Sequence, residues 1–440
     1  MRNEEMARKN VLKNKNFALL FSGVLVSNIA HILFYFAMSL YVLRLATAYV
    51  GEDNAPLIQG YYLLTAGIIL LILMPFGGVL ADRHNKVKTM YITDFFRGFT
   101  ILAVGLVIFL TDNPGTKIVL IFIMAIILGI NAAFFQPASQ SLLKFIVDEE
   151  DLQQASSYMQ GSMSLQNLIG LILGGILYAT IGIYYIFIIN GVAYIISGIT
   201  EIFIKYEVKK NEEATTLNLV IKDIISGVKY VFKFKLIFVI IVVALFLNFF
   251  ISPIYENAMP YFIEFGLKTE ESYLFDSFMS VENWYSAILI ASSISGIIMS
   301  LILSAQKPKE KYHKQINFSL ISFVILCSLI GVVMSLYQKD IVSINVTLVA
   351  TLVLMFLMGF MSVSFNVPVN VTIQKKVDKE HLGKVQSVLS VFSQALIPLS
   401  GLLGGVLISK VSIIALYIFS GVGMIISAFW YIFNKNSKLI

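Results

Sequence analysis

Twelve long apolar stretches constrain this chain more than any other feature of its sequence. They lie at residues 17–43, 57–81, 89–111, 117–141, 154–179, 182–205, 236–265, 282–305, 315–337, 342–370, 384–409 and 411–434. A helix needs about 20 mostly apolar residues to cross the hydrocarbon core of a bilayer, and each stretch meets that length. The sequence therefore predicts an all-α membrane protein with twelve transmembrane helices.

Composition excludes most other classes of protein. Hydrophobic residues make up 58% of the chain and charged residues 13%, against roughly 45–50% and 25% in soluble domains. No soluble core hides that much apolar side chain, and a disordered chain is far more polar. The single cysteine, Cys327, excludes a disulfide scaffold, and four scattered histidines argue against a structural metal site.

The positions of the basic residues indicate topology. The net charge of +6 does not point to nucleic acid, because the lysines and arginines fall in short runs between the apolar stretches. Of the 32 Lys and Arg residues, 26 lie on the side of both termini and five on the other side. Basic residues are enriched in cytoplasmic loops. We therefore expect both termini, and the central segment, to be cytoplasmic.

A central polar segment divides the chain into two halves. We expect a six-helix bundle at 1–205, a cytoplasmic linker at 206–235 and a second six-helix bundle at 236–440. Leu217 to Val231 carries apolar residues at helical spacing, which favours an amphipathic helix on the membrane surface over a plain charged linker. Landmarks recur in the same order in both halves: Gln136-Pro137, Leu152 and Gly174-Gly175, then Val367-Pro368, Leu382 and Gly404-Gly405. Such repeats are typical of transporters whose binding site lies between the halves.

The most specific motif follows the second apolar stretch. It reads Gly77-Gly78-Val79-Leu80-Ala81-Asp82-Arg83-His84-Asn85-Lys86-Val87-Lys88. As a bare pattern it fits a tight turn held at the cytoplasmic face by basic residues, although an acid in a positive loop needs a specific partner. The segment resembles the signature loop of the major facilitator superfamily, with Gly78, Asp82 and Arg83 in place and Asn85 where the signature has glycine.

This resemblance covers the whole chain and implies the major facilitator fold. The chain looks most like the macrolide-efflux and siderophore-export branch of bacterial cytoplasmic-membrane proteins, through Asp82-Arg83-His84, Asp94 with Arg97, Gln136-Pro137-Ala138 and Leu382-Gly383-Lys384-Val385. It implies a cytoplasmic gate of Gly78, Asp82, Arg83, Asp94, Arg97 and Gly383, in which Asp82 caps the helix that begins near Gly383. The i,i+3 spacing of Asp94 and Arg97 fits a pair that neutralises itself and braces the loop. Glu201 is expected at the membrane interface.

Glycines mark two stretches for close helix packing. Gly161, Gly170, Gly174 and Gly175 resemble the antiporter signature of the superfamily, with Leu171 in place of its proline. Gly401 and Gly405 repeat the four-residue glycine spacing in the second half. Close packing explains these glycines without any further role. The stretch 117–141 has no arginine where drug–proton antiporters usually carry one, so the usual coupling element is missing.

Amides near the middle of the apolar stretches are candidates for a substrate cavity. Polar side chains are costly against lipid, so they should face the interior, to bind substrate or to hydrogen-bond neighbouring helices. The predicted cavity residues are Asn28, His31, Tyr35, Gln166, Asn248, Tyr255, Trp284 and Gln394. A cavity of amides and aromatics suits a large, weakly charged amphiphile better than a sugar phosphate or an ion, which need arginine or lysine clamps.

Glu256 is the candidate for proton coupling. It lies near the outer end of the stretch 236–265, where a hydrated interfacial acid is the plainer interpretation. Pro253 can break the helix there, and Tyr255, Pro260 and Tyr261 can shield the carboxylate from water, as a proton carrier requires.

Together these features predict a secondary transporter that exports a hydrophobic or amphiphilic small molecule by proton antiport. The alternatives are a lipid or lysophospholipid transporter of the same fold and a non-transporting membrane sensor. The sequence has no phosphate-binding loop and no catalytic constellation, so neither ATP hydrolysis nor an enzyme is expected. We expect no cofactor and no metal, a monomer in contact with membrane lipid, and protons as the second partner.

Overall fold

The computed structural model describes residues 10–439. Within that range it leaves out residues 84, 149–150, 206–221, 223–224, 226–228, 230–233, 271, 307–310, 378–384, 386–387 and 390. The amphipathic helix expected between Leu217 and Val231 lies largely outside the described residues.

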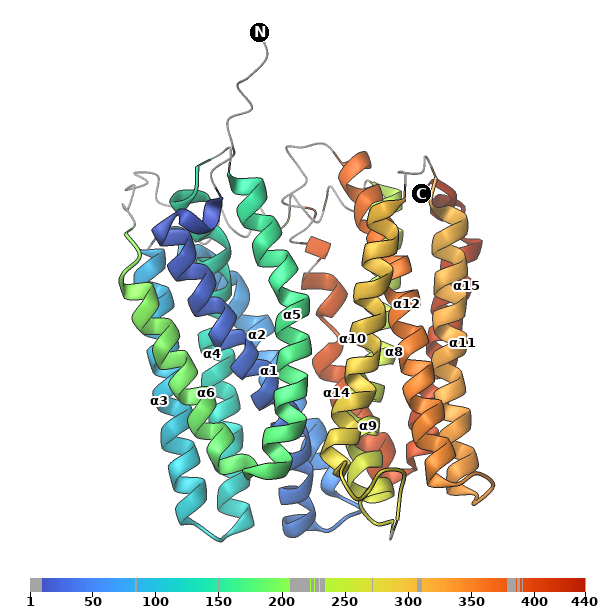
Figure 1. Cartoon of the computed structure of the whole chain (residues 1–440). Coiled ribbons are helices and arrows are strands. Elements are labelled where there is room, and N and C mark those ends of the chain that lie inside the picture. The colour runs from blue at the N-terminus through green and yellow to red at the C-terminus, as the bar shows by residue number, and fades with distance from the viewer. Residues whose placement is uncertain are drawn as a thin grey trace.

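Six helices of the first half form one bundle (Figure 1). They are α1 (Lys15–Val50), α2 (Ala55–Arg83), α3 (Lys86–Leu110), α4 (Pro114–Ile146), α5 (Leu152–Thr180) and α6 (Gly182–Ile202). Asparagines begin three of them: the side chains of Asn14, Asn85 and Asn113 accept hydrogen bonds from the first free backbone N–H groups of α1, α3 and α4. We call this group the N-bundle.

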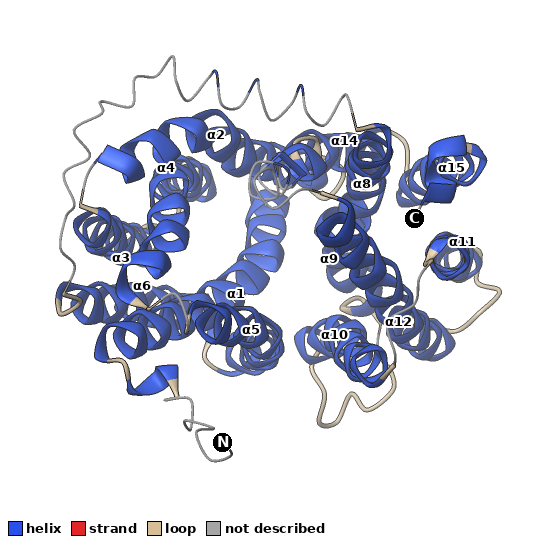
Figure 2. Cartoon of the chain, turned by 90° about the horizontal axis from the view of Figure 1, so that it is seen from above, coloured by secondary structure: helices blue, strands red, loops and turns tan. Residues whose placement is uncertain are grey.

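The second half forms the C-bundle beside it, as the view from above shows (Figure 2). Its helices are α8 (Lys235–Pro253), α9 (Met259–Phe262), α10 (Val281–Ala305), α11 (His313–Gln338), α12 (Ile344–Lys376), α14 (Ile397–Lys410) and α15 (Ile413–Phe433). Both termini lie at the same end of the molecule (Figure 1). We call this the terminal end and the opposite one the far end.

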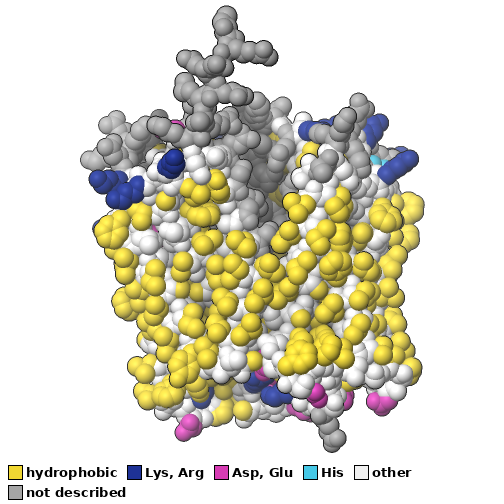
Figure 3. Space-filling view, in the orientation of Figure 1, with side chains coloured by type: hydrophobic (Ala, Val, Ile, Leu, Met, Phe, Trp, Pro, Cys, Tyr) yellow, Lys and Arg dark blue, Asp and Glu magenta, His cyan; other side chains and the backbone are white. Residues whose placement is uncertain are grey.

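The surface has the distribution expected in a bilayer. Hydrophobic side chains cover the middle of the visible face, and the charged side chains gather at its two ends, with Lys and Arg near the terminal end and Asp and Glu beside further Lys and Arg at the far end (Figure 3). Among the described residues, 11 helices are long and apolar enough to cross a membrane, and Leu165–Thr180 of α5 adds a shorter apolar helix. The chain is thus an all-helical, multi-pass protein.

Prolines alter two of the expected helices. The stretch 236–265 is not a uniform helix: α8 ends at Pro253 and continues through wide π-helical turns at Ile254–Ala258 and Ile263–Leu267. The stretch 384–409 is interrupted by a turn at residues 395–396, just before α14. Pro398 causes this break, because its ring clashes with the carbonyl four residues earlier and it has no N–H to donate.

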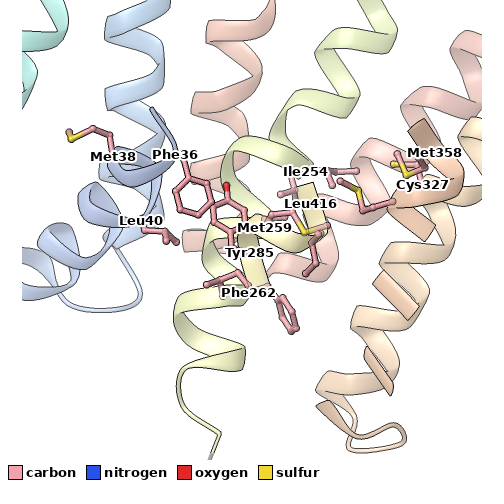
Figure 4. Close-up of a cluster of buried hydrophobic side chains, with 14 of the residues drawn as sticks. Phe36, Met38, Leu40, Ile254, Met259, Phe262, Tyr285, Cys327, Met358 and Leu416 are labelled. Atoms are coloured by element: carbon pink, nitrogen blue, oxygen red, sulfur yellow. The ribbon is translucent and has the colours of Figure 1, made fainter. Parts of the chain in front are cut away.

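The two bundles pack against each other toward the far end. A Cβ added at Gly405 of α14 would lie 2.2 Å from the Pro56 carbonyl of α2, so only glycine permits this approach. In the same way a Cβ at Gly175 of α5 would lie 2.6 Å from Ser286 of α10. Phe36 of α1 stacks on Tyr285 of α10 with ring centroids 4.8 Å apart, inside the apolar cluster drawn in Figure 4.

Candidate functional site

A cavity of about 370 Å³ lies between the two bundles. His31, Tyr35 and Ser39 reach it from α1, and Tyr285 and Leu289 reach it from α10. Tyr255 and Glu256 come from the π-helical turn after α8. π-turns widen a helix locally and occur often at functional sites; here the turn presents two consecutive side chains to one cavity.

A second cavity, of about 430 Å³, continues into the C-bundle. Asn167 and Tyr255 line both cavities, so the two adjoin. Its polar surface consists of hydroxyls and amides, and its lining residues include Asn167, Asn248, Ser292, Ser293, Ser300, Ser362 and Asn366. Among the described residues that line either cavity there is no Lys or Arg, and Glu256 is the sole carboxylate.

Glu256 is held by the opposite bundle. The Tyr35 hydroxyl of α1 donates a hydrogen bond to Oε2 of Glu256. This bond joins the N-bundle to the C-bundle inside the cavity, where Ser39 of α1 and Tyr285 of α10 make a second, longer contact between the bundles at 3.4 Å. A change in the charge of Glu256 would therefore act directly on the contact between the bundles.

The other predicted cavity residues occupy different environments. Asn28 donates to Oε1 of Gln166 at 3.1 Å, and Gln166 is buried and donates to Ser162, so this amide pair joins α1 to α5. Asn248 lines the larger cavity and donates to the Ser393 carbonyl at 3.0 Å. Gln394 is exposed and is not among the lining residues. Trp284 is buried at the far end, where its indole donates to the Leu274 carbonyl.

The predicted glycines make close helix contacts where they are described. A Cβ at Gly170 would lie 2.7 Å from Ile32, and one at Gly174 would lie 3.0 Å from Phe36, so both hold α5 against α1. Gly401 faces Leu63 of α2 across the bundle interface. Gly383 and the side-chain environments of Gly78, Asp82, Arg83 and Gly161 lie outside the described residues, so the Asp82 latch stays a prediction.

The Asp94–Arg97 pair lies in the interior of the N-bundle. Arg97 is 3.5 Å from Asp94, and its guanidinium lies over the rings of Phe135 and Tyr194, 4.7 and 5.4 Å from their centroids. Glu201, expected at the membrane interface, is fully buried among its neighbours in the last turn of α6, and its depth in the membrane stays a prediction. A Cβ added at Gly198, one turn before Glu201, would lie 3.4 Å from the Phe95 ring, so α3 covers this end of α6.

Sequence reasoning missed an ion-pair network at the far end. Arg44 of α1 contacts Glu264 at 2.6 Å and Glu282 at 2.7 Å, and Lys268 contacts Glu264 at 2.7 Å. Arg44 belongs to the N-bundle and both acids to the C-bundle, so the network ties the bundles together. The positions of these residues in the sequence could have predicted the network, because Arg44, Glu264 and Glu282 all lie at ends of apolar stretches on the same side of the membrane.

Known proteins share this architecture. The family model of the Major Facilitator Superfamily matches residues 27–400. The uncharacterized MFS-type transporter YkuC of Bacillus subtilis is 27% identical over 303 residues, which cover 66% of this chain and 66%, just under two thirds, of YkuC. Macrolide efflux protein A of Streptococcus pyogenes is 22% identical over 365 residues, which cover 79% of this chain and 80% of that protein.

A solved structure has the same fold. The crystal structure of a bacterial homologue of the iron transporter ferroportin in the inward-facing state superposes with a TM-score of 0.67 at 12% identity, covering 94% of this chain and 98% of that one. The family match spans most of the chain, and the cavity between two bundles is the architecture that the match requires. The chain therefore belongs to the major facilitator superfamily and is a multi-pass bacterial membrane transporter, not an enzyme.

Proposed function

We propose that this transporter exports a hydrophobic or amphiphilic small molecule, coupled to proton entry through Glu256. One observation carries the proposal: the Tyr35–Glu256 hydrogen bond, which joins the two bundles inside a cavity whose described lining residues include no Lys or Arg. A carboxylate in that position can exchange a proton, and the exchange changes a contact that must break when the bundles move.

The chemistry of the cavities supports the substrate class. Tyrosine, phenylalanine and leucine side chains offer apolar and aromatic area, and serines and amides offer neutral hydrogen bonds. Phosphate or carboxylate substrates need cationic partners, which the described lining lacks. A large molecule with apolar bulk and a few hydroxyl or carbonyl groups fits this surface. The relative named macrolide efflux protein A supports the same class at low identity.

The closed far end supports alternating access. The bundles meet there through the glycine contacts of α2 with α14 and through the ion pairs of Arg44. Among the described residues, these contacts close the space between the bundles at the far end. With the terminal end in the cytoplasm, as the positive-inside distribution favours, this is an inward-facing conformation.

Coupling follows from competition for Glu256. The ionised carboxylate accepts the Tyr35 hydroxyl strongly, because hydrogen bonds to charged groups exceed those between neutral groups. Protonation from the outside removes the charge and weakens that bond, so the bundles rearrange and the cavity releases substrate instead of holding it together with the proton. A proton taken from the outside and released inside then drives the cycle in the export direction.

Proteoliposomes test the proposal. A panel of macrolides and lipophilic cations is loaded, and efflux is measured with and without an imposed pH gradient. We expect gradient-driven efflux in the wild type, and in Glu256→Gln retained substrate binding and exchange without uphill efflux. Glu52→Gln, an exposed acid in the α1–α2 loop, is the control and should behave as wild type. Undiminished uphill efflux by Glu256→Gln would refute the coupling site, and gradient-independent movement of labelled lipid would favour a lipid transporter.

A further inference from the structure

A group of polar residues inside the N-bundle is not used by the coupling step proposed above, although one of them, His31, also lines the cavity between the bundles. Its members are Asp94 and Arg97 of α3, Glu201 and Tyr194 of α6, and His31 of α1. We call it the N-bundle cluster. Asp94 and Glu201 are both completely buried, and Arg97 and Tyr194 are nearly so. His31 is the exposed member, and it faces the cavity between the bundles.

The charges of the N-bundle cluster do not balance. Arg97 keeps its positive charge at any physiological pH. If Asp94 and Glu201 were both ionised, the cluster would hold two negative charges against one positive charge. An uncompensated charge in a low-polarity interior costs several kcal/mol. The two acids also lie close enough to repel each other electrostatically, and carboxylates that share a site do not both ionise readily.

The hydrogen bonds show where the imbalance falls. Arg97 Nη1 reaches Oδ1 of Asp94 at 3.5 Å, while Oδ2 of Asp94 and both carboxyl oxygens of Glu201 have no well-formed hydrogen bond among the described residues, with the Ser197 hydroxyl as their polar neighbour. Glu201 also lies in the last turn of α6. The C-terminal end of a helix carries a partial negative charge and disfavours an anion. Burial, repulsion and the helix end all favour a neutral Glu201.

A polar path leads from the N-bundle cluster to the cavity. Tyr194 lies under the Arg97 guanidinium and within electrostatic reach of Asp94. Its hydroxyl is 3.3 Å from Nδ1 of His31. His31 lines the cavity that also holds Glu256. A hydroxyl and an imidazole, two groups that both donate and accept, thus lie between the buried acids and the cavity.

We infer that the N-bundle cluster is a second proton-binding site, with one exchangeable proton shared by Asp94 and Glu201 beside Arg97 and linked to the cavity through Tyr194 and His31. This site is separate from Glu256, and the inference does not depend on which molecule the chain carries. The titratable and charged groups that face it are the five members of the cluster, on α1, α3 and α6; α4 contributes the Phe135 ring.

Infrared spectroscopy of the full-length protein in lipid nanodiscs tests the inference. The C=O stretching band of a protonated carboxylic acid is recorded near neutral pH in a Glu256→Gln background, so that the cavity acid does not contribute. We expect a band that disappears in Glu201→Gln and changes in Asp94→Asn. Glu52→Gln, which changes an exposed acid, should leave it unaltered. Arg97→Gln should increase the band, because both acids then take up protons.

The rate of deuterium exchange distinguishes the path through Tyr194 and His31 from the proton-binding site itself. His31→Phe and Tyr194→Phe should retain the band and slow its shift on transfer to deuterated buffer, by about tenfold or more, because the path to the cavity is cut. Size-exclusion chromatography and thermal melting report whether each variant is folded. If a variant does not fold, the presence or absence of the band in the folded Glu256→Gln protein still tests the inference. A folded protein without the band, or a band that survives in both Glu201→Gln and Asp94→Asn, would overturn the inference.

Discussion

Removing the Arg44 guanidinium should open the far end of the transporter. Arg44→Gln deletes two charge-assisted contacts between the bundles, to Glu264 at 2.6 Å and to Glu282 at 2.7 Å. The acids are mostly buried, with side-chain exposures of 7% and 12%, whereas Arg44 is 26% exposed. Hydrogen bonds to charged groups contribute about 1.5–3 kcal/mol each. Partial hydration of Arg44, and rehydration of the acids once the far end opens, reduce the combined effect to about 2–3 kcal/mol.

This free energy sets the expected shift in population. Since about 1.4 kcal/mol corresponds to a factor of ten, the ratio of far-end-closed to far-end-open molecules should fall roughly 30- to 150-fold. Pulsed electron paramagnetic resonance measures this directly. Spin labels at Asp112 and Ile341, in far-end loops of the two bundles, are attached in a Cys327→Ala background. We expect a longer-distance population in Arg44→Gln that is nearly absent from the parent.

Lys268→Gln is the matched control for this experiment. Lys268 also contacts Glu264, at 2.7 Å, but it lies four residues away on the same helical segment and its side chain is 47% exposed. Its removal leaves the contact between the bundles intact and should leave the distances unchanged. If Arg44→Gln folds and shows the same distance distribution as Lys268→Gln, the ion pairs do not hold the far end closed and the reasoning fails.

Three further predictions follow from individual contacts. Tyr35→Phe removes the hydrogen bond to Glu256 while keeping the ring, so gradient-driven efflux should fall about tenfold with little change in substrate affinity; an equal loss of both, measured in proteoliposomes, would argue against a role in coupling. Gly405→Ala places a Cβ 2.2 Å from the Pro56 carbonyl and should lower thermal stability by about 1–3 kcal/mol, whereas Gly296→Ala, whose nearest neighbour is a Val363 methyl at 3.3 Å, should cost far less in the same melting assay. Glu212→Cys, in the central segment, should react with an impermeant thiol reagent only in inside-out vesicles. Labelling in intact cells would show that the central segment lies outside and that the predicted orientation is wrong.

The sequence by itself determined the class of the molecule. Apolar stretches of membrane-spanning length dictate helices, because length and hydropathy are local properties of each segment. The motif around Asp82 and the repeated landmarks indicated the family, and the family match over residues 27–400 confirms it. Gly175 and Gly405 were marked for close packing, and each touches the opposite bundle. Pro253 signalled the local break beside Glu256, because the effect of proline on a helix depends only on its own backbone.

Only the tertiary structure decided which polar groups meet. Glu256 resembled an interfacial acid in sequence, and its partner, Tyr35, lies 221 residues away in the chain. Glu201 also resembled an exposed interfacial residue, and the structure buries it completely where α3 packs against the end of α6, with Phe95 against Gly198. In the sequence, Arg44 served only as one of the basic residues that predict the orientation in the membrane. In the structure it forms ion pairs with two acids of the other bundle. The hydropathy of a helix predicts that it lies in the membrane. It does not predict which face of the helix contacts which neighbouring helix. That choice depends on side-chain packing between helices far apart in sequence, and it sets both the partners and the burial of every charge in this transporter.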